Sequence, residues 1–122
     1  MTQKSVLVVD DEAGFRDMYL YLLEPLGIEV SCATNGREAV EKVTERAYDL
    51  LLMDVHMPEM TGPEAFKKIQ QIRPAQKVVI FSSSSVPSYS LENQLLKDGV
   101  INCFYKPVDI DEVLKVLNQV LN

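Results

Sequence analysis

The segment 50–54 reads Leu50-Leu51-Leu52-Met53-Asp54, an uninterrupted apolar run that ends on a carboxylate. A short run without polar alternation is typical of a strand buried on both faces, as strands of a parallel sheet are. Similar runs lie at Val6–Val9 and Val78–Phe81. The pattern predicts a parallel sheet in which one buried strand ends at Asp54.

Two more strands are expected, at 28–33 and 102–105, and segments of helical periodicity separate the strands. The residues expected on the buried helix faces are Phe15, Met18, Tyr19, Leu22, Leu23 and Leu26; Ala39, Val40 and Val43; Phe66, Ile69 and Ile72; Leu91, Leu95 and Leu96; Val113, Leu117, Val120 and Leu121. The helix boundaries are indicated by Thr34 or Asn35 and Asp109 as N-caps, Pro63 at a first position, and Gly27 and Gly99 as stops.

Five strands that alternate with five helices predict an α/β fold, because parallel neighbours need crossover helices. Right-handed crossovers then give a doubly wound three-layer sandwich with a five-stranded parallel sheet. Ligands of such folds bind outside the carboxyl ends of the strands. The residues that follow each strand are therefore the candidate site.

The composition fits one soluble domain over residues 1–122, with 47% hydrophobic and 25% charged residues. The net charge of −6 argues against direct nucleic-acid binding. No apolar run approaches the ~20 residues of a membrane span, and the N-terminus lacks a signal peptide, so we expect a cytoplasmic protein. The two cysteines, Cys32 and Cys103, are expected to be reduced and packed as small hydrophobes.

Charged and polar residues follow four of the predicted strands: Asp10 and Asp11, Asp54, Ser82, and Lys106. Crowded carboxylates repel one another unless a proton or a cation neutralises them. Mg²⁺ suits such a site because it takes hard oxygen ligands. Together with a lysine, this set favours phosphoryl transfer, in which Asp54 is the best nucleophile and forms an acyl phosphate.

Several motifs, in order along nearly the whole chain, resemble the receiver domain of bacterial response regulators in two-component systems. They are Val8-Val9-Asp10-Asp11-Glu12, Asn35-Gly36-Arg37-Glu38-Ala39, Tyr48 to Pro58, Gly62, Val78 to Ser82, and Phe104-Tyr105-Lys106-Pro107. The resemblance implies a flavodoxin-like sandwich with strand order 2-1-3-4-5, and a single receiver domain with no output domain in the chain.

The resemblance also implies a Mg²⁺ site. In that family, the position of Asp11 binds the metal directly and that of Asp10 usually acts through water. Asp54 and the backbone carbonyl of His56 would complete the protein ligands.

The same resemblance assigns the phosphoryl chemistry. Asp54 matches the phosphorylated aspartate, Ser82 the switch hydroxyl, and Lys106 the lysine that pairs with the phosphoryl group, with a bond to Pro107 that is typically cis. The donor would be a sensor histidine kinase or a phosphotransfer protein, and the output a changed surface for an effector. Such a domain phosphorylates and dephosphorylates itself rather than turning over a substrate.

The chain departs from the family at Cys103, which stands where an aromatic switch residue is common. Strand alternation points Phe104 to the other side of the sheet. The segment from Ser82 to Gly99 is also about two residues longer than is usual, which predicts an irregular entry to the fourth helix.

Other interpretations stay open from sequence alone. Asp10 and Asp11 could cap a helix, and Ser82 could belong to a polar serine loop. His56, the only histidine, is expected at the rim of the acidic site. A phosphatase with an aspartyl-phosphate is one alternative, and a cobalamin-binding domain is another, although Glu59 replaces the glycine of its motif. A receiver-like scaffold that never switches is the third.

Overall fold

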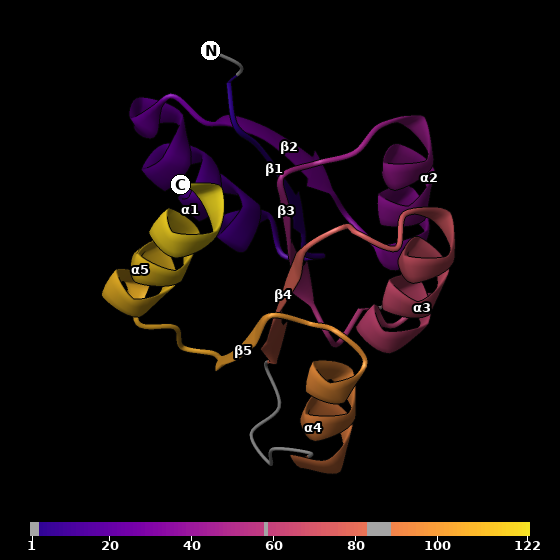
Figure 1. Cartoon of the computed structure of the whole chain (residues 1–122). Helices are drawn as coiled ribbons and strands as arrows, with labels where there is room; N and C mark the ends of the chain where they lie inside the picture. Colours follow the sequence, from indigo (N-terminus) through magenta and orange to yellow (C-terminus); the bar gives the residue numbers. More distant parts are fainter. Residues whose placement is uncertain (1–2, 58, 83–88) are drawn as a thin grey trace.

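Five parallel strands form one sheet in the order β2-β1-β3-β4-β5, as predicted (Figure 1). The computed structural model describes residues 3–57, 59–82 and 89–122. The strands are β1 Ser5–Val9, β2 Glu29–Ala33, β3 Leu50–Asp54, β4 Val78–Ser82 and β5 Asn102–Tyr105. β1, β3 and β4 are buried along their whole length, which explains why their sequences are continuously apolar.

Five α-helices cover the sheet on both faces: α1 Ala13–Leu23, α2 Gly36–Glu45, α3 Gly62–Ile72, α4 Tyr89–Lys97 and α5 Ile110–Leu121. Helices α1 and α5 lie on one face, while α2, α3 and α4 lie on the other (Figure 1). In β3, Leu51 and Met53 pack toward α2 and α3, and Leu50 and Leu52 pack toward α1 and α5. The three-layer α/β sandwich is therefore confirmed.

Side-chain caps fix where the helices begin. The Asn35 side chain accepts a hydrogen bond from the Glu38 backbone N–H at 2.8 Å, and the Glu38 carboxylate accepts from Thr34 in return. Asp109 caps α5 by accepting from the backbone N–H groups of Asp111 and Glu112. Both predicted caps are confirmed, and Asn35 rather than Thr34 is the N-cap of α2.

Three residues expected on buried helix faces are exposed instead: Leu26 by 64%, Ile72 by 41% and Leu96 by 41%. Helix α1 ends at Leu23, and a 3₁₀ turn, η1 Glu24–Leu26, follows before Gly27 adopts a left-handed conformation with φ 81°. The tighter turn takes Leu26 off the buried stripe, because 3₁₀ periodicity differs from that of the α-helix. Ile72 is the last residue of α3.

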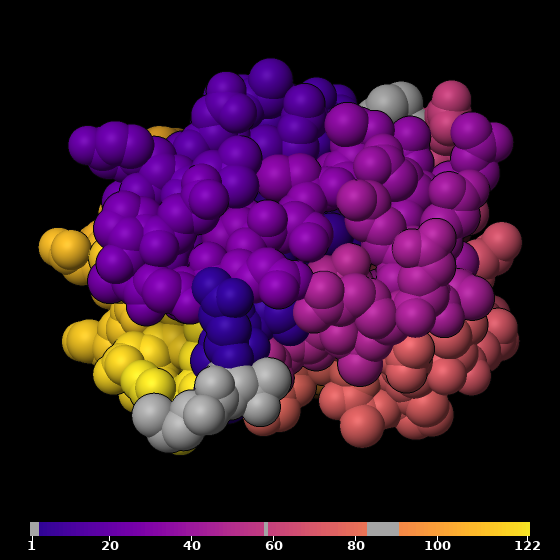
Figure 2. All heavy atoms as spheres, turned by 90° about the horizontal axis from the view of Figure 1, so that it is seen from above, coloured from indigo at the N-terminus to yellow at the C-terminus, as the bar shows by residue number. Residues whose placement is uncertain are grey.

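The predicted irregular entry to α4 concerns residues 83–88, which lie outside the described residues. Within the part that is described, no helix has the length and apolar character needed to cross a bilayer. In a view from above, the C-terminal end of α5 lies close to the first described residues of the chain (Figure 2).

Candidate functional site

The strand register brings the predicted site residues to one edge of the sheet. Asp54 is the last residue of β3 and pairs with Phe81, the residue before Ser82. Lys106 follows β5, and its backbone N–H donates to the carbonyl of Ser82 at 2.8 Å. Asp10 follows β1, the neighbour of β3. These four residues therefore lie at the carboxyl ends of adjacent strands, as the fold rule predicted.

One ammonium bridges two buried carboxylates at this edge. The Lys106 Nζ donates to Asp10 Oδ2 at 2.9 Å and to Asp54 Oδ2 at 3.4 Å. The side chain of Lys106 is only 8% exposed, and Asp10 and Asp54 are 4% and 1% exposed. Ion pairs in such surroundings are poorly screened by salt, so the site carries strong local fields.

Opposing effects set the protonation of this pair. Burial raises the pKa of Asp54, although the backbone N–H of His56 and the Lys106 ammonium both act to lower it. Burial alone would lower the pKa of Lys106, but the adjacent carboxylates of Asp10, Asp54 and Glu12 outweigh it and the pKa is raised. Lys106 is therefore firmly cationic, which allows Asp54 to hold a negative charge in a buried position.

Four carboxylates converge closely enough to hold a metal ion. Oxygen atoms of Asp10, Asp11, Glu12 and Asp54 all lie within 4.8 Å of one another. Asp11 and Glu12 are exposed, which leaves an approach from solvent. An all-oxygen, strongly anionic donor set with an open side suits Mg²⁺, which binds a few carboxylates and keeps other positions for water or phosphate oxygens. The predicted residues thus fit a divalent cation.

Sequence reasoning did not assign Glu12 to this cluster, although it had placed Glu12 in the acidic motif. Its carboxylate also lies 3.6 Å from the Lys106 Nζ. The feature of the sequence that could have assigned Glu12 to the cluster is its position directly after Asp10 and Asp11, beyond the end of the strand.

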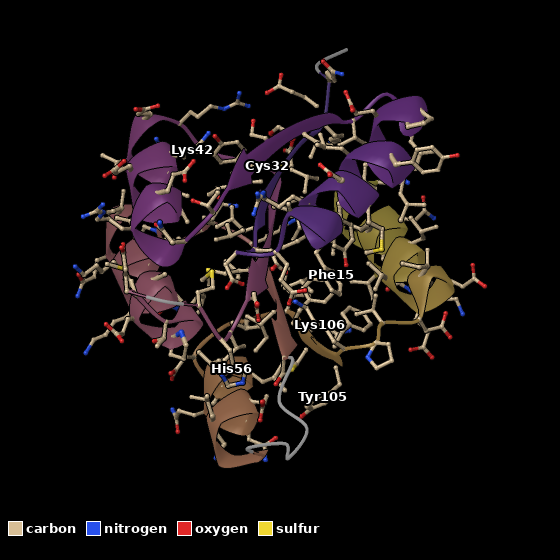
Figure 3. All side chains as sticks on the ribbon, turned by 180° about the vertical axis from the view of Figure 1, so that it is seen from behind. Phe15, Cys32, Lys42, His56, Tyr105 and Lys106 are labelled. Atoms are coloured by element: carbon tan, nitrogen blue, oxygen red, sulfur yellow. The ribbon has the colours of Figure 1, made fainter. Side chains whose placement is uncertain are left out.

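His56 touches the site through its backbone. Its N–H donates to Asp54 Oδ1 at 3.1 Å, which fixes the second oxygen of that carboxylate. The residue is exposed at the carboxyl end of the sheet (Figure 3), as its predicted place at the rim requires. The role of its carbonyl as a metal ligand stays a prediction.

The Ser82 hydroxyl is completely buried and has no hydrogen-bond partner among the described residues. Buried hydroxyls are normally satisfied, so an unpartnered one next to an acidic site needs an explanation. It is available to donate to an oxygen that enters the site.

The two residues before Tyr105 point to opposite faces, as strand alternation predicted. Cys103 packs on the side of α2, α3 and α4, while Phe104 packs on the side of α1 and α5 and stacks on Phe81. Both cysteines are free thiols, as expected. Burial, together with the nearby Glu92, raises the pKa of the Cys103 thiol to about 11, so it is neutral at ordinary pH.

A further contact to the site comes from α1. The face of the Phe15 ring lies 3.8 Å from the Lys106 Nζ, measured to the ring centroid (Figure 3). From the sequence, Phe15 was expected only in the apolar stripe of its helix. Periodicity gives the face of a helix but not which side chain from another element will meet it.

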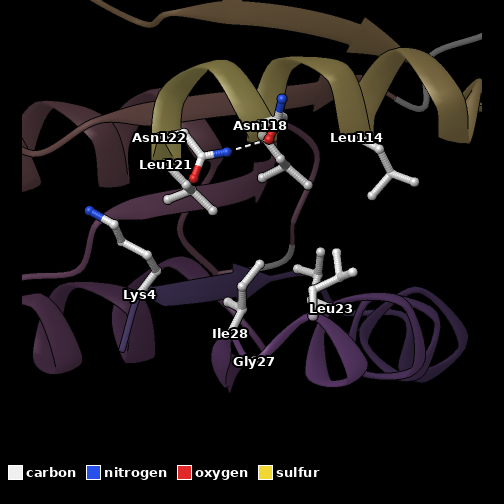
Figure 4. Close-up of a pocket in the computed structure, with 10 residues that line it drawn as sticks. Lys4, Leu23, Gly27, Ile28, Leu114, Asn118, Leu121 and Asn122 are labelled. Atoms are coloured by element: carbon white, nitrogen blue, oxygen red, sulfur yellow. Dashed lines mark hydrogen bonds between the residues drawn. The ribbon is translucent and has the colours of Figure 1, made fainter. Parts of the chain in front are cut away.

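A separate pocket of about 320 Å³ lies between η1 and α5, at the end of the sheet opposite the carboxylates (Figure 4). Its walls are mainly apolar, and none of the residues that line it is acidic: Lys4, Leu23, Leu26, Gly27, Ile28, Leu114, Leu117, Asn118, Leu121 and Asn122. It lacks the groups for metal binding or phosphoryl transfer.

Comparison with known proteins gives consistent matches over nearly the whole chain. The sequence profile of the response regulator receiver domain matches residues 6–118. The chemotaxis protein CheY of Thermotoga maritima is 40% identical over 118 residues, which cover 96% of this chain and 97% of that protein. The transcriptional regulatory protein ZraR of Klebsiella oxytoca is 36% identical over 119 residues, 98% of this chain but 26% of ZraR.

Solved structures agree with the sequence matches. A response regulator receiver protein from Pseudomonas putida superposes with a TM-score of 0.91 at 25% identity, covering 98% of each chain. A CheY-like receiver domain protein from Methanospirillum hungatei gives a TM-score of 0.89 at 28% identity, over 98% of this chain and 94% of the other.

Proposed function

Because the chain belongs to the family of response regulator receiver domains, we propose that Asp54 accepts a phosphoryl group and thereby switches the domain between two states. The observation that carries this proposal is the Lys106 ammonium, which is held between Asp10 and Asp54, two members of a cluster of four carboxylates. The one positive charge of Lys106 cannot balance four carboxylates, and a divalent ion would neutralise the excess negative charge.

In the proposed reaction, a carboxylate oxygen of Asp54 attacks the phosphorus atom of a phosphohistidine, and the bond from phosphorus to the histidine nitrogen breaks. Asp10, Asp11 and Asp54, with the His56 carbonyl, would hold Mg²⁺, and Glu12 lies close enough to join them. The ion supplies neutralisation of charge on the transferring phosphoryl oxygens. The donor is a sensor histidine kinase or a phosphotransfer protein.

Lys106 and Ser82 have complementary roles in this proposal. The Lys106 ammonium pairs with a phosphoryl oxygen, and the unpartnered Ser82 hydroxyl donates to another. The two residues share a main-chain hydrogen bond, so a displacement at one is felt by the other. The resulting shift biases an existing equilibrium and alters the surface that an effector recognises. The domain acts as a cytoplasmic switch rather than a turnover enzyme.

The test is intact-mass analysis after incubation with acetyl phosphate and Mg²⁺. The wild type should gain the mass of one phosphoryl group, and EDTA should prevent the gain. Asp54→Ala should gain nothing, while Asp17→Ala, which alters an exposed carboxylate of α1, should behave as the wild type. Lack of modification in the wild type, or equal modification of Asp54→Ala, would refute the proposal.

A further inference from the structure

We infer that Phe15 is a positioning residue for the proposed phosphoryl transfer: its ring holds the Lys106 ammonium at Asp54 while the carboxylates change partners. The inference rests on the proposed function. It starts from the contact between Phe15 and Lys106, in which the ring centroid lies 3.8 Å from Nζ. That distance is well inside the ~6 Å within which a ring face attracts a cation.

The contact is formed where water is largely excluded. The Lys106 side chain is 8% exposed, and Phe15 is itself half-buried against the core formed by α1, α5 and the sheet. Attraction between a cation and a ring is strongest when both are desolvated. The contact between Phe15 and Lys106 thus has the geometry of a strong cation–π interaction rather than of an incidental surface contact.

Phe15 differs in kind from the other neighbours of the ammonium. Among the described residues, those are the carboxylates of Asp10 at 2.9 Å, Asp54 at 3.4 Å and Glu12 at 3.6 Å. Each carboxylate belongs to the acidic cluster that fits a divalent cation. A metal ion bound in this cluster competes with the Lys106 ammonium for the same carboxylate oxygens. A phosphoryl group on Asp54 occupies one of these oxygens and removes it as a partner of the ammonium.

The ring is therefore the contact that loading of the site leaves intact. Lysine has a flexible four-carbon stem, and an ammonium released from Asp10 has many positions open to it. The ring limits that freedom, because moving away would give up an attraction in a dry environment. Lys106 then stays aimed at Asp54 through metal binding and transfer, at little entropic cost in the transition state.

A spectroscopic test reads the contact directly. Protons on the Lys106 Cε lie near the ring face and should show upfield-shifted resonances in the wild type. The shift should persist when Mg²⁺ and beryllium fluoride, a phosphoryl mimic, are added. It should vanish in Phe15→Leu and survive in Phe15→Tyr. An unshifted Cε signal in the wild type, or loss of the shift on loading, would overturn the inference.

A kinetic test measures the consequence. Phe15→Leu should lower the maximal rate of phosphorylation by acetyl phosphate about three- to tenfold, with little change in the Mg²⁺ concentration that gives half-maximal rate. Phe15→Tyr should restore most of the rate. Phe104→Leu removes an aromatic ring from the same core cluster, where Phe104 stacks on Phe81, and it should phosphorylate as the wild type does.

The outcomes separate the two proposals. If the wild type is phosphorylated and Phe15→Leu reacts at the same rate, the positioning role is wrong and the proposed function stands. If the rate falls equally in Phe104→Leu, the effect is one of general packing and the positioning role is again wrong. If the wild type is not phosphorylated at all, both proposals fail.

Discussion

Replacing Gly62 by alanine should destabilise the domain and disturb Asp54 together. Gly62 is the first residue of α3, and its N–H donates to the Val55 carbonyl at 2.9 Å. A Cβ added there would meet the Val55 Cα at 2.7 Å and the Asp54 carbonyl oxygen at 2.8 Å. Both are main-chain atoms, so no flexible side chain can turn aside.

The size of the effect follows from this geometry. Ordinary contact begins at 3.4 Å, so the backbone after β3 must move by about 0.7 Å to admit the methyl group. Overpacking of this kind costs about 1–3 kcal/mol. Alanine in a helix recovers roughly 0.5–1 kcal/mol relative to glycine. We expect a net loss of about 1–2 kcal/mol in the free energy of unfolding, or about 3–10 °C in melting temperature for a domain of this length.

A second glycine provides the matched control. Gly14 lies in α1, and a Cβ added there would find nothing within 4 Å. Gly14→Ala should therefore stabilise the domain by up to about 1 kcal/mol. Urea unfolding followed by circular dichroism measures both variants, and acetyl phosphate labelling reports on Asp54. If Gly62→Ala proves as stable as Gly14→Ala and is labelled normally, the backbone after β3 does not limit the size of the side chain at position 62, and the prediction is wrong.

Three further predictions concern ionisable groups that are buried or partly buried. Asp54→Asn should be more stable than the wild type at pH 7 by about 1 kcal/mol, since it relieves the repulsion among crowded carboxylates while Lys106 keeps its ion pair with Asp10. The pKa of Asp54 is raised in the folded protein, so protonation of this carboxylate stabilises the folded wild type. The stability advantage of Asp54→Asn should therefore shrink as the pH falls through the raised pKa toward the ordinary value of 3.8. Urea unfolding curves that give the same advantage at all pH values would contradict this prediction. Glu92 is 2% exposed, and its carboxylate has no hydrogen-bond partner among the residues described. Glu92→Leu should therefore raise the free energy of unfolding by about 1–3 kcal/mol. A lower free energy of unfolding in urea would refute this prediction. The Cys103 thiol, with its pKa near 11, should react slowly with iodoacetamide at pH 8 and much faster in urea; equal rates would show that the thiol is not shielded.

Much of the site was predictable because few physical constraints determine it. Continuous apolar runs require strands buried on both faces, and parallel strands place their carboxyl ends at one edge. Asp10, Asp54, Ser82 and Lys106 could thus be brought together without coordinates. The strand order and the caps at Asn35 and Asp109 agree as well.

What sequence reasoning missed depends on side-chain directions and on where helices leave the sheet. Periodicity placed Leu26 and Ile72 on buried stripes, but it does not reveal that η1 tightens the chain or that α3 ends at Ile72. The approach of Phe15 to Lys106 joins residues far apart in sequence, and it arises from how α1 packs on the sheet. No local pattern encodes such a contact.

The pocket at the amino end of the sheet has a practical consequence for attaching reporters. Lys4 and Asn122 both line it, so the two ends of the described chain lie close together. The five residues of β1 separate Lys4 from Asp10, a distance of about 19–20 Å at the usual rise per residue. A dye or affinity handle joined to either end would therefore stand well clear of the carboxylates. A donor and acceptor pair at both ends would report global unfolding without perturbing the chemistry at the far edge.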